Sequence, residues 1–267
     1  MQSSIKPIPQ DVSIPVLNGT EKGEVHGWYF AANSAVKKNR LIVHFHGNGQ
    51  NLTTHFLFFR WMIDYGYDYL IFDYRGYGSS SGESASQQKT VEDGEAVFKY
   101  VHENFSQDKV VAIGQSLGSN VLVRTLQEIN RKNQNQLLPQ FVVLDSSFLS
   151  YQSAASEILS SRWFLYPLIP FSYVLISDEW SAKSQLKFTP KLPALFLHGT
   201  QDQTISFEQG KKNFDLWPGP KVFSTQDGGG HTSAFSDRRF LSARAMLLDC
   251  IEAALESERS FEKCGKD

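Results

Sequence analysis

Cysteine is scarce in this chain, and long basic runs and long uninterrupted apolar runs are absent. Two cysteines, Cys250 and Cys264, stand among 267 residues without the spacing of a metal site. We expect a buried thiol and a tail thiol, with a disulfide between them as the alternative. The net charge of −2, with no basic run, argues against a nucleic acid as partner.

Signals for export or membrane insertion are also missing. Residues 1–10 contain two prolines and no apolar core of signal-peptide length. The longest apolar stretch, residues 163–176, has fourteen positions broken twice by proline. A transmembrane helix needs about 20 apolar residues. We therefore expect a cytoplasmic protein by default, with membrane association through a segment further upstream as the alternative.

Strand-like and helix-like segments alternate along the chain. Strands are predicted near 11–17, 24–31, 40–46, 68–74, 109–115, 140–145, 193–199 and 221–226. Helices are predicted near 51–65, 86–104, 117–132, 206–216 and 234–256. Because no linker interrupts this alternation, the sequence predicts one α/β domain over residues 1–267.

One motif indicates a nucleophile. Gly114-Gln115-Ser116-Leu117-Gly118 follows four apolar residues and precedes a helix-like segment. Glycines two residues either side of a serine permit a sharp turn from strand to helix, which lifts the hydroxyl clear of the backbone. We therefore predict Ser116 as the nucleophile. Ser146 and Ser147 also end a strand, but no such turn surrounds them.

A serine hydroxyl needs a base, and the base needs a carboxylate that orients it. Asp202 follows the strand-like segment 195–199, and His231 follows three glycines after the last strand. The order Ser116, Asp202, His231 is that of α/β-hydrolases and differs from the chymotrypsin and subtilisin orders. Asp145, at the end of another strand, is the alternative acid. The glycines before His231 predict a mobile loop.

The strand at 41–46 leads into Gly47-Asn48, where backbone groups could stabilise an oxyanion. We expect the N–H of Asn48 to join the N–H of Leu117 in this role. His44 and His46 lie on one side of the strand, but no further ligand with suitable spacing completes a metal site. We expect neither metal nor cofactor.

Five segments together resemble the Bem46-like group of α/β-hydrolases, to which serine hydrolases of the ABHD type are related. These segments are residues 46–51, 72–82, 114–118, 197–202 and 229–231. The resemblance implies an α/β-hydrolase fold, with a mostly parallel eight-stranded sheet flanked by helices. It also implies a triad of Ser116, Asp202 and His231. Members of the group act on lipid-like esters and thioesters.

Residues 147–190 depart from the alternation, and in this fold the corresponding position carries a lid over the active site. A lid there would determine the substrate. Its apolar run has three alternative roles: packing onto the core, forming a wall for an acyl chain, or docking to a membrane. If the apolar run forms a wall for an acyl chain, the candidate substrate-binding residues are Trp163, Phe164 and Phe171.

The predicted function is hydrolysis of an acyl ester through an acyl-enzyme. A thioesterase or protein depalmitoylase is the next alternative, and a peptidase follows. A non-catalytic binding module with the same fold is the alternative from another class, but such modules usually lack a triad member. The expected partner is a small-molecule acyl ester or thioester.

Overall fold

The computed structural model describes residues 8–18, 21–82, 85–105, 109–160, 163–256, 261 and 263–264. Its strands are β1 (Gln10–Asn18), β2 (Glu21–Phe30), β3 (Arg40–Phe45), β4 (Asp68–Phe72), β5 (Lys109–Gln115), β6 (Phe141–Asp145), β7 (Ala194–Gly199) and β8 (Lys221–Gln226). They form one sheet in the order β1-β2-β4-β3-β5-β6-β7-β8. Neighbouring strands from β4 to β8 are parallel, and β1 and β2 are antiparallel. The predicted mostly parallel, eight-stranded sheet is confirmed.

Helices connect and flank these strands. The α-helices are α1 (Leu52–His55), α2 (Gln87–Asn104), α3 (Leu117–Arg131), α4 (Tyr151–Ser160), α5 (Ile169–Leu175), α6 (Phe207–Leu216), α7 (Ser233–Ser236) and α8 (Ser242–Glu256). Short 3₁₀ helices are η1 (Ser34–Val36), η2 (Phe56–Phe58), η3 (Arg60–Tyr65), η4 (Asn135–Leu137), η5 (Trp163–Leu168), η6 (Ala182–Phe188) and η7 (Arg238–Phe240).

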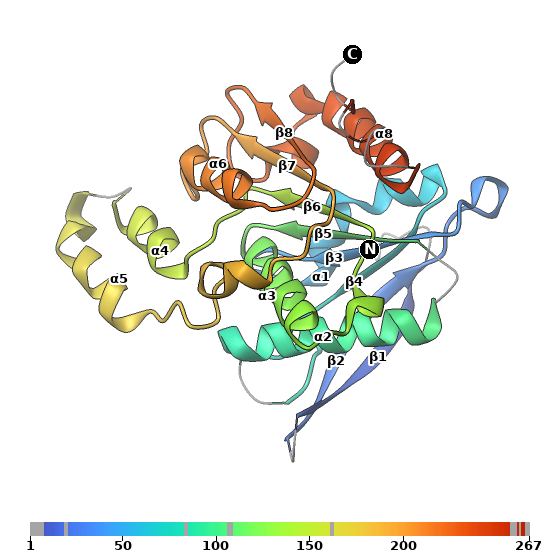
Figure 1. The fold of residues 1–267 in the computed structure, drawn as a ribbon, viewed down its shortest axis with the longest axis horizontal. Coiled ribbons are helices and arrows are strands. Elements are labelled where there is room, and N and C mark those ends of the chain that lie inside the picture. The colour runs from blue at the N-terminus through green and yellow to red at the C-terminus, as the bar shows by residue number, and fades with distance from the viewer. Residues whose placement is uncertain are drawn as a thin grey trace, which may run out of the picture.

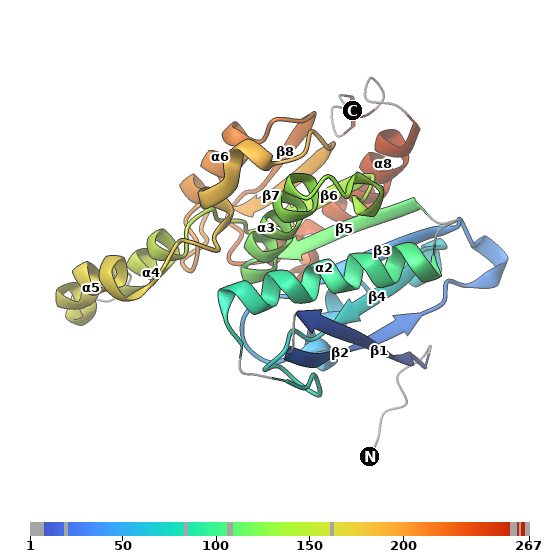
Figure 2. The same cartoon turned by 60° about the horizontal axis from the view of Figure 1, so that its bottom comes forward.

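Both faces of the sheet are buried. Successive side chains of a strand point to opposite faces, and β3 shows the consequence. Leu41 and Val43 pack with α2 and α3, whereas Ile42 packs on the other face with α8 and the segment after α1. Figures 1 and 2 show α2 and α3 lying across one face of the sheet. Burial on both faces explains why the central strands read as continuous apolar runs.

The helix predicted over 51–65 is instead one turn of α-helix followed by two 3₁₀ helices. Phe59 interrupts it with φ −125° and ψ 0°. Phe56, Phe59 and Met62 are all buried against the sheet and lie three residues apart. Phe56 lies in η2, Phe59 between the two 3₁₀ helices and Met62 in η3, and this spacing of three residues matches the three-residue turn of a 3₁₀ helix.

The helix predicted over 234–256 is also interrupted. Asp237 has extended backbone dihedrals, φ −98° and ψ 125°, which end α7. Its carboxylate accepts a hydrogen bond from the N–H of Arg239 at 2.9 Å and so begins the next turn. Aspartate favours such capping positions because its side chain replaces a missing backbone acceptor.

The segment expected to form a lid contains four short helices. Figures 1 and 2 show α4 and α5 extending beyond the sheet, away from α8. The later helix η6 instead returns to the body, where Gln127 of α3 donates a hydrogen bond to the carbonyl of Ala182 at 2.9 Å. That residues 147–190 form a lid over the active site stays a prediction.

Among the described residues, no helix is both long and apolar enough to cross a bilayer.

The expectation of two free thiols is wrong. Cys250 of α8 and Cys264 form a disulfide, with their Cα atoms 5.1 Å apart. Phe261 is fully buried, its ring centroid 5.4 Å from that of Phe141 in β6, and this packing brings the end of the chain back to α8. Spacing along the sequence could not reveal this return.

We expect Cys264→Ser to lower the free energy of unfolding by about 3 kcal/mol, because the disulfide closes a short loop and restricts the unfolded chain. Denaturant unfolding of both proteins measures this difference. Iodoacetamide should label neither cysteine of the unfolded, unreduced chain and both after reduction. Two labels without reductant would contradict the disulfide.

Candidate active site

Ser116 lies in a sharp turn between β5 and α3. Its φ is 51° and ψ −116°, a conformation rare for a residue with a side chain. Strain of this kind persists only where the surroundings enforce it, and it is concentrated at functional sites. The side chain is half-buried, at the carboxyl end of a buried strand.

The glycines beside Ser116 are required by close packing. A Cβ on Gly114 would lie 2.7 Å from Cα of Ser119, and one on Gly118 would lie 2.0 Å from the carbonyl oxygen of Phe45. Both distances are far below van der Waals contact. The motif therefore lets the first turn of α3 pack directly against the ends of β3 and β5.

Hydrogen bonds align the strand ends around this turn. The N–H of Ser116 donates to the carbonyl of Asp145 at 2.9 Å, and the N–H of Ser146 donates to the carbonyl of Leu197 at 2.9 Å. The N–H of Thr232 donates to Oγ of Ser146, also at 2.9 Å. The serine turn, the ends of β6 and β7, and the loop that carries His231 therefore meet at one edge of the sheet.

Asp202 and His231 are in direct contact. Oδ2 of Asp202 lies 2.8 Å from Nδ1 of His231. Oδ1 accepts hydrogen bonds from the N–H groups of Thr204 at 2.8 Å and Ile205 at 3.0 Å. The carboxylate is fully buried, whereas about a quarter of the His231 side chain (26%) is exposed. Two of the predicted site residues are thus brought together.

A second histidine, which the sequence interpretation missed, supports the carboxylate. Nε2 of the buried His198 lies 3.4 Å from Oδ2 of Asp202 and 3.0 Å from the carbonyl oxygen of Ile205. Burial alone would raise the pKa of Asp202, but hydrogen bonds from His198 and His231 outweigh burial and hold the pKa well below its usual range. Asp202 therefore stays ionised at neutral pH.

Asp145, the alternative acid, has a different environment. Oδ2 accepts a hydrogen bond from Nε2 of Gln115 at 2.9 Å, and Oδ1 is buried with no hydrogen-bond partner among the described residues. Burial raises the pKa of Asp145 to about 6. A carboxyl group that takes up a proton near neutral pH is a poor permanent counter-ion for a histidine. The contacts favour Asp202.

The glycine-rich loop before His231 is hydrogen-bonded along its length. The N–H of Gly228 donates to Oγ1 of Thr200 at 2.8 Å, and the carbonyl of Gly229 accepts from the N–H of Gln201 at 2.8 Å. A Cβ on Gly199 would lie 2.3 Å from that same carbonyl oxygen, so the loop lies directly on the end of β7. These contacts restrain the loop that we expected to be mobile.

The two predicted oxyanion donors lie beside Ser116. A Cβ on Gly47 would lie 3.6 Å from Cβ of Ser116, so the turn after β3 passes close to the serine. The side chain of Asn48 is fixed by a hydrogen bond from Tyr77 at 2.9 Å. Leu117 begins α3, where the first backbone N–H groups have no partner within the helix.

A cavity of about 420 Å³ adjoins Ser116, Leu117 and Asn48. One face of α4 forms a wall of it through Tyr151, Ala154, Ala155 and Ile158, at the i, i+3, i+4, i+7 spacing of a helix face. Phe148, Ile176 and Ile205 add apolar surface, and none of the described lining residues is charged. This periodicity was readable in the sequence, but the sequence interpretation did not use it.

The predicted substrate-binding aromatics lie elsewhere. Trp163, Phe164 and Phe171 are 79%, 57% and 54% exposed, and none of them lines the cavity beside Ser116. They belong to η5 and α5, which extend past α4, so α4 separates them from the serine. In this conformation α4, and not the aromatic run, faces the nucleophile.

The two histidines of β3 have structural partners. Nδ1 of His44 lies 2.8 Å from Oη of Tyr69, and Nε2 lies 3.1 Å from Oε1 of Gln115. Nδ1 of His46 lies 2.7 Å from the carbonyl oxygen of Gly47. Within the described ranges, no three His, Cys, Asp or Glu side chains are grouped as metal ligands.

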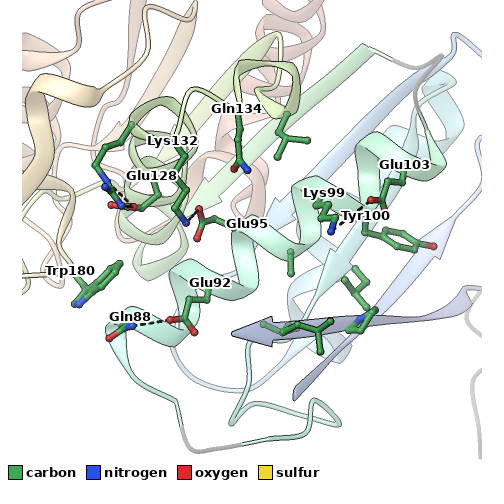
Figure 3. A pocket seen from close by; sticks show the side chains of 17 residues that line it. Gln88, Glu92, Glu95, Lys99, Tyr100, Glu103, Glu128, Lys132, Gln134 and Trp180 are labelled. Atoms are coloured by element: carbon green, nitrogen blue, oxygen red, sulfur yellow. Dashed lines mark hydrogen bonds and ion pairs between the residues drawn. The ribbon is translucent and has the colours of Figure 1, made fainter. Parts of the chain in front are cut away.

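A second hollow lies between β1, α2 and α3, and Figure 3 shows its charged lining. Nζ of Lys132 is 2.6 Å from Oε1 of Glu95, and Nζ of Lys99 is 4.0 Å from Oε1 of Glu103. None of the predicted site residues reaches this hollow. Its paired charges leave no single sign to attract a ligand.

The family profile described as serine aminopeptidase, S33, matches residues 36–187, more than half of the chain. The YfhR protein of Salmonella typhimurium is 28% identical over 260 residues, which are 94% of this chain and 85% of YfhR. Protein bem46 of Schizosaccharomyces pombe is 27% identical over 183 residues, 62% of this chain and 56% of bem46. Lysophosphatidylserine lipase ABHD12 of Danio rerio is 26% identical over 198 residues, 71% of this chain and 50% of the lipase. The predicted resemblance is confirmed.

Solved structures share the fold. Esterase Pf2001 of Pyrococcus furiosus superposes with a TM-score of 0.65 at 18% identity, over 93% of this chain and 90% of the esterase. The predicted α/β-hydrolase fold is therefore confirmed, and it is the fold of esterases and lipases. Together with the profile match, this establishes that the chain belongs to the serine aminopeptidase S33 family of α/β-hydrolases.

Proposed function

We propose that this hydrolase cleaves acyl esters through an acyl-enzyme, with Ser116 as nucleophile, His231 as base and Asp202 as the orienting acid. The 2.8 Å contact between Asp202 and His231, at the sheet edge where Ser116 is turned outward, carries the proposal. A non-catalytic module would have no need for a strained serine at the same sheet edge as a paired histidine and carboxylate.

The chemistry follows from these positions. As Oγ of Ser116 attacks the ester carbonyl carbon, Nε2 of His231 takes its proton, because Nδ1 is held by Asp202. The ionised Asp202 stabilises the resulting imidazolium. The N–H groups of Asn48 and Leu117 bind the oxyanion, and His231 then protonates the departing alcohol. Water repeats these steps on the acyl-enzyme and releases the acid.

The lining of the cavity favours an uncharged acyl group. An aminopeptidase must bind the positively charged amino terminus of a peptide, for which a carboxylate is the ordinary partner. The described lining residues include no Asp or Glu, and α4 presents alanine and isoleucine instead. Each methylene of an acyl chain that such a wall removes from water contributes about 0.8 kcal/mol of favourable binding free energy. A thioester of the same acyl group fits the same machinery and is the second substrate to test.

We expect Ser116→Ala and His231→Ala each to lower kcat/KM for a p-nitrophenyl ester by about 10⁴-fold or more. The double variant should be little worse than either single variant, because residues that act as one unit are not additive. Thermal midpoints should remain close to that of the unmodified enzyme. Additive losses in the double variant would contradict a shared step.

A parallel test distinguishes Asp202 from Asp145 as the orienting acid. We expect Asp202→Asn to lower kcat by several orders of magnitude, because an amide cannot stabilise the imidazolium. Asp145→Asn should have a far smaller effect on kcat, since Asp145 contacts Gln115 instead. If Asp145→Asn abolished activity and Asp202→Asn retained it, the orienting acid would be Asp145 instead of Asp202.

The wall formed by α4 should set the acyl length. We expect Ala155→Phe, which fills the cavity, to lower kcat/KM for octanoyl esters about fiftyfold relative to acetyl esters if three methylenes lose their burial. Trp163→Ala and Phe171→Ala, at exposed positions, should leave this length profile unchanged with soluble esters. If they shift the profile and Ala155→Phe does not, the original assignment to the lid aromatics holds.

A further inference from the structure

Exposed apolar side chains are concentrated in one part of the molecule. Among the described residues, sixteen large apolar side chains are exposed, and eight of them lie within residues 163–175. These eight form what we call the apolar patch. They are Trp163, Phe164, Tyr166, Leu168, Phe171, Tyr173, Val174 and Leu175. Val174 and Leu175 are 79% and 78% exposed, which is costly for aliphatic groups in water.

The patch carries no charge. Residues 163–177 contain no Asp, Glu, Lys or Arg. Two nearby carboxylates are held by hydrogen bonds: Glu157 accepts from Ser206 at 2.9 Å, and Asp178 accepts from Ser150 at 2.5 Å. Within residues 163–177 there is therefore no charged side chain to attract or repel a lipid headgroup.

The composition of the patch matches a lipid–water interface. Trp163, Tyr166 and Tyr173 have apolar rings with polar tips, the kind of side chain enriched where a bilayer meets water. Val174 and Leu175 supply purely apolar groups. The run is too short to span a bilayer but long enough to lie within its surface.

The position of the patch suits a surface that is broad and flat. Figures 1 and 2 show α5 at the outermost part of the molecule, clear of the sheet. The helix is firmly held, because Nε2 of Gln152 in α4 donates to the carbonyls of Tyr173 at 3.2 Å and Ile176 at 2.9 Å. A bilayer can therefore approach α5 without meeting the body of the protein.

The patch is also continuous with the cavity beside Ser116. Ile176 follows α5 directly and lines the cavity, and Ile158 of α4 lines it while remaining 48% exposed. A chain leaving a lipid layer at α5 would thus meet apolar side chains along its path to the serine. This continuity distinguishes a lipid surface from a second copy of the chain, which has no reason to cover the mouth of the site.

We propose that the apolar patch docks the protein on the surface of neutral, zwitterionic lipid. Docking goes beyond the proposed hydrolysis and does not require it. It is therefore measured on Ser116→Ala, which cannot consume the lipid, so that a failure of docking and a failure of the proposed reaction are observed separately.

The test is flotation with phosphatidylcholine vesicles at low and high salt. Ser116→Ala protein should float with the vesicles equally at both salt concentrations, because the contact is apolar. Adding Val174→Ser and Leu175→Ser should weaken partitioning about tenfold or more. The matched control adds Leu17→Ser and Leu57→Ser, at side chains 74% and 55% exposed on other elements, and should leave partitioning unchanged.

Several results would overturn the proposal. These are failure to float, binding that needs anionic lipid or disappears in salt, and equal losses in the patch and control variants. Light scattering tests the other occupant: a dimer that the patch substitutions dissociate would show that a second copy covers the patch. If the patch docks on lipid, the protein should be a monomer in solution, and the patch and control variants should keep the thermal midpoint of Ser116→Ala.

Discussion

The close approach of α3 to the ends of β3 and β5 is the constraint on which the site depends. No side chain fits at Gly118, where a Cβ would lie 2.0 Å from the carbonyl oxygen of Phe45. With the helix seated so tightly, the backbone has no relaxed route from β5 into α3, and Ser116 takes a positive φ. The same contact brings the turn after β3, with Asn48, beside the serine.

The two acidic residues at neighbouring strand ends show how environment assigns chemical roles. Asp202 receives two backbone hydrogen bonds and contacts from two imidazoles, which favour its ionised form. Asp145 is also buried, but it accepts only one hydrogen bond, from Gln115, and its other oxygen has no partner among the described residues, so burial outweighs that bond and raises its pKa to about 6. Identical side chains one strand apart are thus suited to different tasks, and only Asp202 touches His231.

Local patterns predicted most of the fold and singled out the residues that form the candidate site. The glycines around Ser116 report a steric requirement that is local, and buried parallel strands appear directly as apolar runs. Asp202 and His231 could also be predicted, because each follows one of the last predicted strands and their order along the chain matches that of an α/β-hydrolase triad. The return of the chain to α8 was not readable: Cys264 pairs with Cys250, and Phe261 between them packs against Phe141 of β6.

The position of the aromatic run, away from the cavity, could not be predicted for a related reason. Hydrophobicity identifies Trp163 and Phe171 as apolar, but it does not say which apolar surface faces the serine. That choice depends on how α4 and α5 pack, and α4 takes the inner position with a face of small residues. The sequence did not point to His198. Its contact with Asp202 depends on how the loop between the two residues folds, and no rule of sequence spacing describes that fold.

Covalent catalysis at one serine is central to the proposed function, and a fluorophosphonate probe tests it most directly. Intact-mass and peptide mass spectrometry of the labelled enzyme should show one adduct, on the peptide that contains Ser116. Ester hydrolysis should be lost in proportion to labelling. A fully labelled enzyme that keeps its activity, or a stoichiometric adduct on a different residue, would contradict the account.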